Sequence, residues 1–162
     1  MPHVIPNILG PDAVGSAAWA DAAAIVPWQM YLTYGQEHFL VDSFDSARKW
    51  VDYMHRAGEE EFLWLGGTHF GDWLGLDAEA NALGDERKGA TDDYFTANVC
   101  FAWSLQILAD TAAVLQYAED ARRWSRRREE LVRAFRAEYV TPTGRLAVSY
   151  THLRAHETDS YL

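Results

Sequence analysis

The feature that most constrains the fold of this chain is an alternation between two kinds of helical hydrophobic pattern. Residues 16–34 and 92–117 are apolar and rich in alanine, and in 92–117 apolar residues cover most of the helix circumference, which is typical of a buried helix. Residues 37–57 and 118–139 instead combine a narrow apolar stripe with many charged residues, as surface helices do. The pattern predicts four helices in the order inner, outer, inner, outer.

Two all-α architectures produce this order of joined αα-hairpins: an α-solenoid and an (α/α) barrel. No repeat period is visible, because the glycine- and aromatic-rich segment 58–91 interrupts any register, and this favours the barrel. A connection of that length is unusual unless it is functional. Four helices cannot close such a barrel, so we expect a partial domain.

Composition excludes several functional classes. The net charge is −10, which disfavours binding to nucleic acids or anionic membranes, since both need a basic surface. Cys100 is the only cysteine, so neither a disulfide framework nor a cysteine zinc site is expected. No apolar run reaches about 18 residues, and no signal peptide is visible, which favours a cytoplasmic location. We expect no metal and no cofactor.

Acidic residues stand out at three locations. Asp21 opens the first inner helix, Asp92 and Asp93 open the second, and Asp72 lies in the connection between the hairpins. If the inner helices are parallel, all of these acids converge at one rim, together with Trp73. Asp21 shares a helical face with apolar residues, and an acid on a buried face needs a partner or a pocket.

Each candidate also has a structural interpretation, which the sequence leaves open. An acid in the first turn of a helix is common without any function, and a tryptophan or histidine on an apolar face is often part of the core. The basic run 122–128 is most simply the solvated face of an outer helix. These alternatives apply to Asp21, Trp28, His69, Asp72, Trp73, Asp92 and Asp93.

Several motifs occur in the order in which one known family carries them. Residues 15–28 (GSAAWADAAAIVPW) resemble the segment GSAGWGDAAVIVPW of bacterial α-L-rhamnosidases, family 78 of the glycoside hydrolases. Residues 50–53 resemble its RWVDY segment, and 69–74 (HFGDWL) resemble its HFGDWL loop. Residues 89–92 and 141–147 match later segments, so the resemblance covers about residues 4–147. Ala20 departs from the usual glycine.

The resemblance implies an (α/α)6 catalytic barrel that hydrolyses terminal α-L-rhamnosides with inversion, on a rhamnose-containing glycan or glycoside. The family's general acid is a glutamate in a DCPQRDERLGW-like motif, and its general base is a glutamate in a WERW-like motif. Neither motif occurs here, so we expect a central fragment that is inactive alone. The resemblance also implies that Asp21, Trp28 and Trp73 match substrate-pocket positions, with Asp72 and His69 beside them.

The end of the chain breaks the pattern. Residues 148–158 (VSYTHLRAHET) resemble the translation of a transposase-type sequencing adapter. We therefore expect residues 1–147 to be a partial catalytic domain and 148–162 to be a non-native tail, which is set aside when the fold is considered.

Two alternatives remain at this stage. The chain could belong to another (α/α)6 glycosidase, or it could be a small α-helical binding module that is complete as it stands. The fragment hypothesis predicts exposed apolar faces on the helices at 16–34 and 92–117, where missing neighbours would pack.

Overall fold

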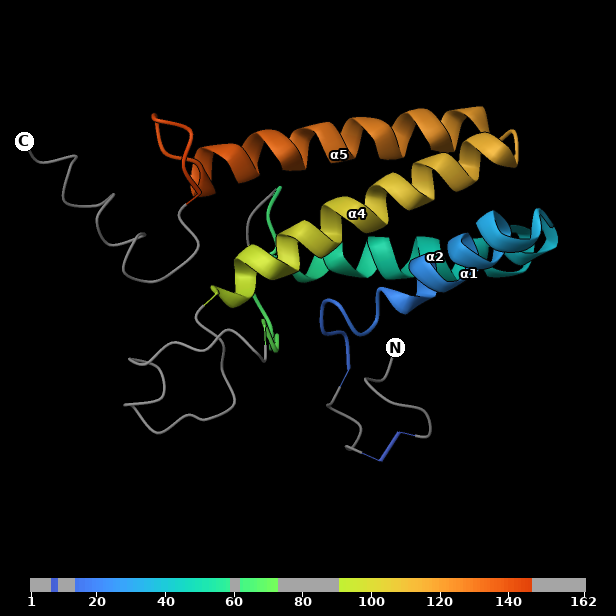
Figure 1. Cartoon of the computed structure of the whole chain (residues 1–162), viewed down its shortest axis with the longest axis horizontal. Coiled ribbons are helices and arrows are strands. Elements are labelled where there is room, and N and C mark those ends of the chain that lie inside the picture. Colours follow the sequence, from blue (N-terminus) through green and yellow to red (C-terminus); the bar gives the residue numbers. More distant parts are fainter. Residues whose placement is uncertain (1–6, 9–13, 59–61, 73–90, 147–162) are drawn as a thin grey trace, which may run out of the picture.

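The computed structural model describes residues 7–8, 14–58, 62–72 and 91–146. Its described residues form four helices, which are shown in Figure 1: α1 (Ala22–Tyr34), α2 (His38–Ala57), α4 (Asp93–Val114) and α5 (Ala118–Tyr139). The predicted all-α fold is confirmed, and so is the pairing of the helices into two hairpins.

The helices are arranged so that α4 has neighbours on several sides. It packs against α5, its partner in the second hairpin, and also against α1 and α2. In Figure 1, α4 lies between α5 and the α1–α2 pair, and the first turns of α1 and α4 point to the same end of the bundle. The loop 62–72 lies at that end too. This is the shared rim that the sequence predicts.

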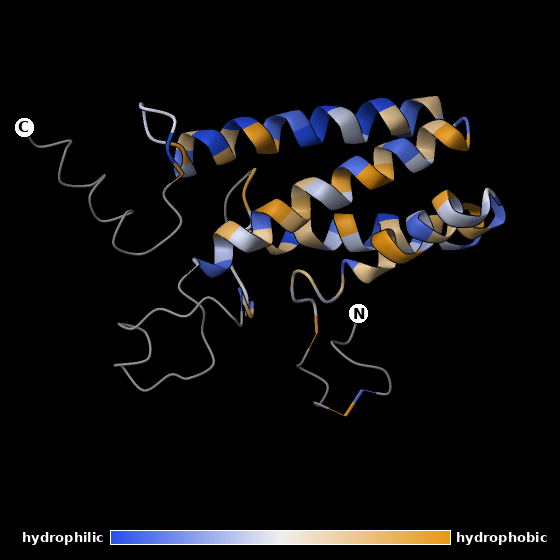
Figure 2. Ribbon diagram, viewed as in Figure 1, coloured by the Kyte–Doolittle hydropathy of each residue, from blue (hydrophilic) through white to orange (hydrophobic). Residues whose placement is uncertain are grey.

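The apolar stripes of the outer helices form the core together with α4. On α2 the predicted stripe is confirmed, because Leu40, Val51 and Met54 are fully buried. From α4, Phe101 and Leu105 belong to the same core cluster as Val51 and Met54. Each such side chain contributes roughly 1.5–3 kcal/mol through removal from water. Figure 2 shows the complementary surface, since α5 is mostly hydrophilic and carries only isolated hydrophobic positions.

The first helix begins later than the sequence predicts. The sequence indicates that Ser16 caps a helix over 16–34, but α1 starts at Ala22 and residues 17–21 form turns. The reason is Ala18, whose φ of 66° lies in the left-handed region and cannot continue a right-handed helix. Gly35 ends the helix as expected, with a φ of 67°.

The third predicted helix is shorter at both ends than expected. Its N-cap is Asp92 and not Thr91, because Asp92 Oδ1 accepts a hydrogen bond of 2.7 Å from the backbone N–H of Phe95. It ends at Val114 and not at Tyr117, since Gln116 has a φ of 62°. The predicted helices at 37–57 and 118–139 agree with α2 and α5 within one residue.

Both inner helices expose large apolar side chains. On α1, Val26 and Leu32 are 54% and 57% exposed, and on α4, Val99 and Trp103 are 46% and 49% exposed. This confirms the expected apolar surface on the two helices. By length and composition alone, α4 is long and apolar enough to cross a membrane. The sequence contains no apolar run of about 18 residues, so such a helix was not expected. Core helices of soluble proteins meet the same criterion, and α4 is packed by all three other described helices.

Replacing Ala18 by glycine is expected to stabilise the protein by about 1 kcal/mol. The residue is exposed and its left-handed backbone is strained for any residue with a Cβ atom. The matched control is Ala137→Gly, which makes the same change at an exposed α5 position and should destabilise by about 1 kcal/mol. Urea unfolding of the two variants would contradict the interpretation if both changes had the same sign.

Candidate functional site

The candidate site lies at the end of the bundle where α1 and α4 begin. Three segments meet there: the turns at 14–21, the loop 62–72 and the entry to α4 at 91–93. The hydrogen bonds between them involve side chains, and these include two of the candidates that the sequence singles out, His69 and Asp72. The described residues at this end divide into a buried layer and a surface layer.

Asp21 is the centre of the buried layer. Its side chain has no exposure to solvent. Oδ2 accepts a hydrogen bond of 2.7 Å from the backbone N–H of Ala18. Oδ1 accepts from Trp50 Nε1 at 2.9 Å and from the Ser104 hydroxyl at 2.5 Å. A buried carboxylate requires such donors, and these three connect the first turn with α2 and α4.

Aromatic rings extend this layer toward the loop. The Trp50 ring stacks on Tyr53 with a centroid distance of 5.5 Å, and both rings meet Trp64 edge to face. Gly15 packs directly against the Tyr53 ring. It has a φ of 78°, and a Cβ atom at this position would overlap the Tyr53 side chain. Only glycine accommodates both the backbone angle and this close approach.

His69 fastens the loop to the turns before α1. Its Nδ1 accepts a hydrogen bond of 3.2 Å from the backbone N–H of Ala17, and its Nε2 lies 3.1 Å from the Gly66 carbonyl oxygen. Together these contacts assign the neutral tautomer with the proton on Nε2. Burial lowers the pKa of His69 below its usual 6.5, against the opposing effects of the Gly66 carbonyl and the acids Asp93 and Asp21.

The protein is therefore expected to lose stability as the pH falls through about 6.5. The unfolded chain takes up a proton on His69 near this pH while the folded chain resists it, so the free energy of unfolding decreases toward acid. We therefore expect this group to make the free energy of unfolding lower at pH 5.5 than at pH 7.5. Urea unfolding at both pH values measures how much the free energy of unfolding changes with pH. This change should be smaller in His69→Gln than in the wild type, and it should largely persist in His55→Gln. An equal change in the wild type and in His69→Gln would contradict the assignment to His69.

Asn98 on α4 is a residue that the sequence patterns did not single out. It is fully buried, and its side chain binds both backbone groups of Trp64. The Trp64 N–H donates to Asn98 Oδ1 at 2.8 Å, and Asn98 Nδ2 donates to the Trp64 carbonyl at 3.1 Å and to the Tyr94 carbonyl at 2.8 Å. An amide side chain inside the most apolar helix was the available signal, since buried polar groups require partners.

The surface layer contains the acid of the predicted loop. Asp72 is half-buried, and its Oδ2 accepts a hydrogen bond of 2.6 Å from the Thr91 hydroxyl just before α4. Gly71 before it has a φ of 53° and lies so close to Asp93 that an added Cβ atom would overlap the Asp93 carboxylate. The loop and the start of α4 therefore hold Asp72 at the surface, close to a second carboxylate.

An aromatic pair lies on the same surface. Trp19 is 39% exposed, and its ring meets that of Phe70 edge to face at a centroid distance of 5.9 Å. Neither residue is among the candidates that the sequence indicates, although both belong to the motifs at 15–28 and 69–74. A partly exposed aromatic surface beside a carboxylate can contact the apolar face of a sugar ring while the acid accepts its hydroxyl protons.

The two tryptophan candidates differ in what the structure describes. Trp28 is half-buried, packs against the core and lies 5.6 Å from the Tyr31 ring. It is seven residues beyond Asp21, which places it about 10 Å further along the helix axis. Trp73 lies outside the described residues, so its place at the rim stays a prediction.

Among the described residues there is no cluster of three or more metal-ligating side chains.

Comparison with known proteins identifies relatives over most of the chain. A family model described as the bacterial α-L-rhamnosidase six-hairpin glycosidase domain matches residues 1–157. An α-L-rhamnosidase of Alteromonas sp. (strain LOR) is 36% identical over 124 residues, which cover 76% of this chain and 13% of that protein. One from Formosa agariphila is 30% identical over 138 residues, covering 83% and 14%. The chain thus spans about one seventh of the length of these relatives.

Solved structures agree with these sequence relatives. The crystal structure of a native α-L-rhamnosidase from Aspergillus terreus superposes with a TM-score of 0.79 and 25% identity, over 98% of this chain and 20% of that one. The Streptomyces avermitilis α-L-rhamnosidase in complex with L-rhamnose gives a TM-score of 0.69 and 27% identity, over 85% and 12%. The four helices therefore correspond to part of a six-hairpin glycosidase domain.

Proposed function

The chain belongs to the bacterial α-L-rhamnosidase six-hairpin glycosidase family, and we propose that it contributes one part of the rhamnose-binding rim in an enzyme that hydrolyses terminal α-L-rhamnosides. The observation that carries this proposal is the surface layer at the start of α1 and α4. There a half-buried carboxylate, Asp72, lies in the loop that also places Phe70 beside the exposed Trp19.

The chemistry of this surface suits a deoxy sugar. L-Rhamnose presents hydroxyl groups that a carboxylate accepts, and it also presents a methyl group and C–H faces that pack on aromatic rings. A relative that is 27% identical has been solved with L-rhamnose bound, which supports the same sugar here. Trp28 and Trp73 remain our proposed contacts for the ring and its methyl group.

We assign Asp21 and His69 to supporting roles behind this surface. All hydrogen bonds described for Asp21 come from protein donors, and both side chains are buried. A sugar hydroxyl could reach Asp21 only by displacing one of those donors, at the cost of an unsatisfied buried group. The two residues instead fix the positions of the turns at 17–21 and of the loop 62–72.

The proposed reaction of the whole enzyme is inverting hydrolysis. In that mechanism one carboxylic acid protonates the leaving oxygen and a carboxylate about 6.5–9.5 Å away activates water. The motifs that carry these two groups in the family are absent from residues 1–162. We therefore expect no turnover of an aryl α-L-rhamnoside by this chain alone, and any turnover that disappears in Asp21→Ala would contradict this expectation.

Binding of L-rhamnose tests the proposed rim without requiring turnover. Saturation-transfer NMR on the 1–162 chain should detect L-rhamnose more strongly than L-mannose, which carries a CH2OH group in place of the methyl group. Asp72→Asn should weaken the L-rhamnose signal several-fold, because a neutral amide accepts hydroxyl protons less well than a carboxylate. The matched control is Asp42→Asn on the exposed side of α2, which should leave it unchanged. Equal signals for both sugars, or equal losses in both variants, would contradict the proposal.

A further inference from the structure

A cavity of about 340 Å³ lies between the outer helices α2 and α5, and it is unusually basic for this chain. It is lined by apolar residues at its base and by charged residues around them: Val51, His55, Phe101, Glu119, Arg122, Arg123, Trp124, Arg126, Arg127 and Glu130. The rhamnosidase proposal does not use this cavity, because its surface layer is built from the turns at 14–21, the loop 62–72 and the entry to α4.

The arginines that line the cavity follow the helical repeat of α5. Arg122 and Arg126 are separated by four residues, and so are Arg123 and Arg127, so all four lie along one face of the helix. The sequence alone indicates a solvated face for this run. The structure confirms this for Arg122, Arg123 and Arg126, which are exposed, and it also places them along the rim of the hollow that Val51 and His55 of α2 line from the other side.

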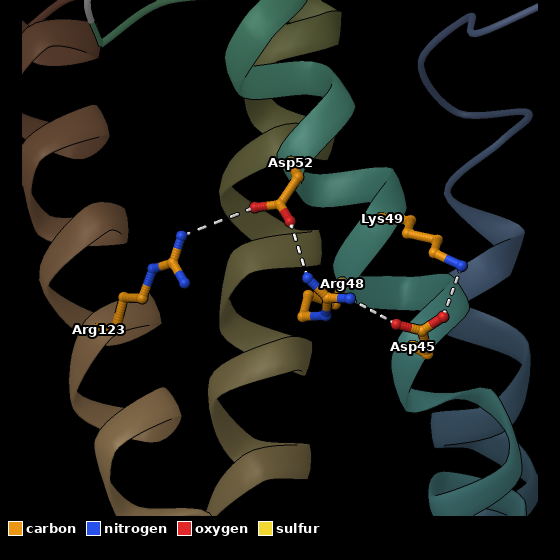
Figure 3. A network of polar contacts seen from close by, with 5 residues as sticks. All are labelled: Asp45, Arg48, Lys49, Asp52 and Arg123. Carbon is orange, nitrogen blue, oxygen red and sulfur yellow. Dashed lines mark hydrogen bonds and ion pairs between the residues drawn. The ribbon is translucent and has the colours of Figure 1, made fainter.

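The lining carries more positive than negative charge. Four arginines line it against the two glutamates, which gives a local balance of 4 − 2 = +2 in a chain whose net charge is −10. Arg122 pairs with Glu119, and Arg127 lies 3.7 Å from Glu130. Asp52 of α2 approaches from outside the lining: it lies 3.9 Å from Arg123 and 3.4 Å from Arg48, as Figure 3 shows.

A buried donor in the same lining points to a missing acceptor. Trp124 is only 3% exposed, and its Nε1–H has no hydrogen-bond acceptor among the described residues. Arg123 lies over the Trp124 ring, with 4.4 Å between its guanidinium carbon and the ring centroid. An unsatisfied buried N–H costs free energy and calls for an explanation such as an ion or water. The cavity therefore has an excess of donors as well as of positive charge.

We propose that the cavity between α2 and α5 binds a small oxyanion of the phosphate or sulfate class. Guanidinium groups bind such oxyanions through two parallel hydrogen bonds, which an ammonium group cannot reproduce. Four guanidiniums on one helix face provide the donors that tetrahedral oxygens need. Three of them also lie within ion-pair distance of Glu119, Asp52 or Glu130, and the buried indole N–H of Trp124 lies in the same lining. The ligand is either the free anion or the same group carried on a sugar.

His55 links this site to pH. It lies beside Arg127, which it contacts through Nδ1. Burial lowers the pKa of His55, as do Arg127, Arg123 and Arg56, while Asp52 opposes them. An oxyanion in the cavity would favour the charged imidazolium, so binding should tighten as the pH falls below about 6.5. Sulfate is the suitable probe because its charge stays constant over this range.

Calorimetric titration of the 1–162 chain with sodium sulfate tests the proposal, with sodium chloride at matched ionic strength as the reference. The Arg122→Gln/Arg126→Gln variant should bind sulfate about tenfold more weakly, because two charge-assisted donors are lost. The matched control is Arg133→Gln/Arg136→Gln, which changes the charge equally on α5 outside the cavity lining. The control should bind within about twofold of wild type.

A charge-conserving variant separates a built site from diffuse attraction. Arg122→Lys/Arg126→Lys keeps the charge and removes the planar fork, so binding should fall several-fold. Wild-type affinity in this variant, or equal losses in both glutamine variants, would overturn the proposal and leave an adventitious ion only. Glucose 1-phosphate and inorganic phosphate then distinguish the sources. Tighter binding of the sugar phosphate assigns a phosphorylated sugar, and equal binding assigns the free anion.

Discussion

Replacing Asp21 by alanine is expected to lower the free energy of unfolding by at least about 3 kcal/mol, which would be the largest effect of any single change considered. The substitution removes the acceptor of three donors, the Ala18 N–H, the Trp50 indole N–H and the Ser104 hydroxyl. Each buried donor left unsatisfied costs about 1–3 kcal/mol. Urea unfolding followed by circular dichroism measures the loss.

Two further variants separate the role of the acid from its volume. Asp21→Asn keeps one carbonyl oxygen for Trp50 and Ser104 but turns an NH2 group toward the Ala18 N–H, so an intermediate loss is expected. The matched control is Asp110→Ala on α4, whose carboxylate accepts one hydrogen bond of 2.9 Å from Gln106 in a half-buried position. If Asp21→Ala were no more destabilising than Asp110→Ala, the buried network would not be a structural centre.

Replacing Asn98 by leucine is expected to release the loop 62–72 from α4 and to cost about 3 kcal/mol. The leucine cannot pair with the N–H and carbonyl of Trp64 or with the Tyr94 carbonyl. Trp64 is 1% exposed, so its backbone groups would be left without partners away from water. Hydrogen exchange should show faster exchange at the Trp64 amide than in the wild type.

The pattern of hydrogen exchange along the chain distinguishes a local effect of Asn98→Leu on the loop 62–72 from a destabilisation of the whole protein. We expect exchange to increase in 62–72 more than in α5, because the lost hydrogen bonds join only the loop and α4. Gln106→Leu is the control on the same helix, since its side chain bonds Asp110 within α4. Uniform acceleration throughout the chain, or the same pattern in the control, would contradict a specific role in holding the loop.

Much of the fold could be predicted because it depends on local patterns. The stripe of α2 at Leu40, Val51 and Met54 is buried as its helical spacing predicts. Gly35 ends α1 as expected, because a left-handed residue stops the helix there. The common rim of α1 and α4 followed from the expectation that the inner helices run parallel.

The candidate site was harder to predict because burial at its residues is decided by distant segments. Asp21 and His69 were predicted to belong to the substrate pocket. In the structure both are buried, with partners 83 and 52 positions away in Ser104 and Ala17. Trp19 and Phe70 were passed over, although they form an aromatic pair in which Trp19 is exposed and Phe70 is half-buried. No periodicity within one helix indicates which of these side chains a remote loop will cover.

The sequence by itself determined the four helices, their inner and outer character and the resemblance to the α-L-rhamnosidase family, because these depend on spacing within short segments and on motif order. Only the tertiary structure decided that Asp21 is a buried acceptor, that Asn98 holds the loop and that the arginines of α5 surround a cavity. These properties arise where segments far apart in the chain meet. The cost of burying a polar group there depends on the partners that the fold brings to it.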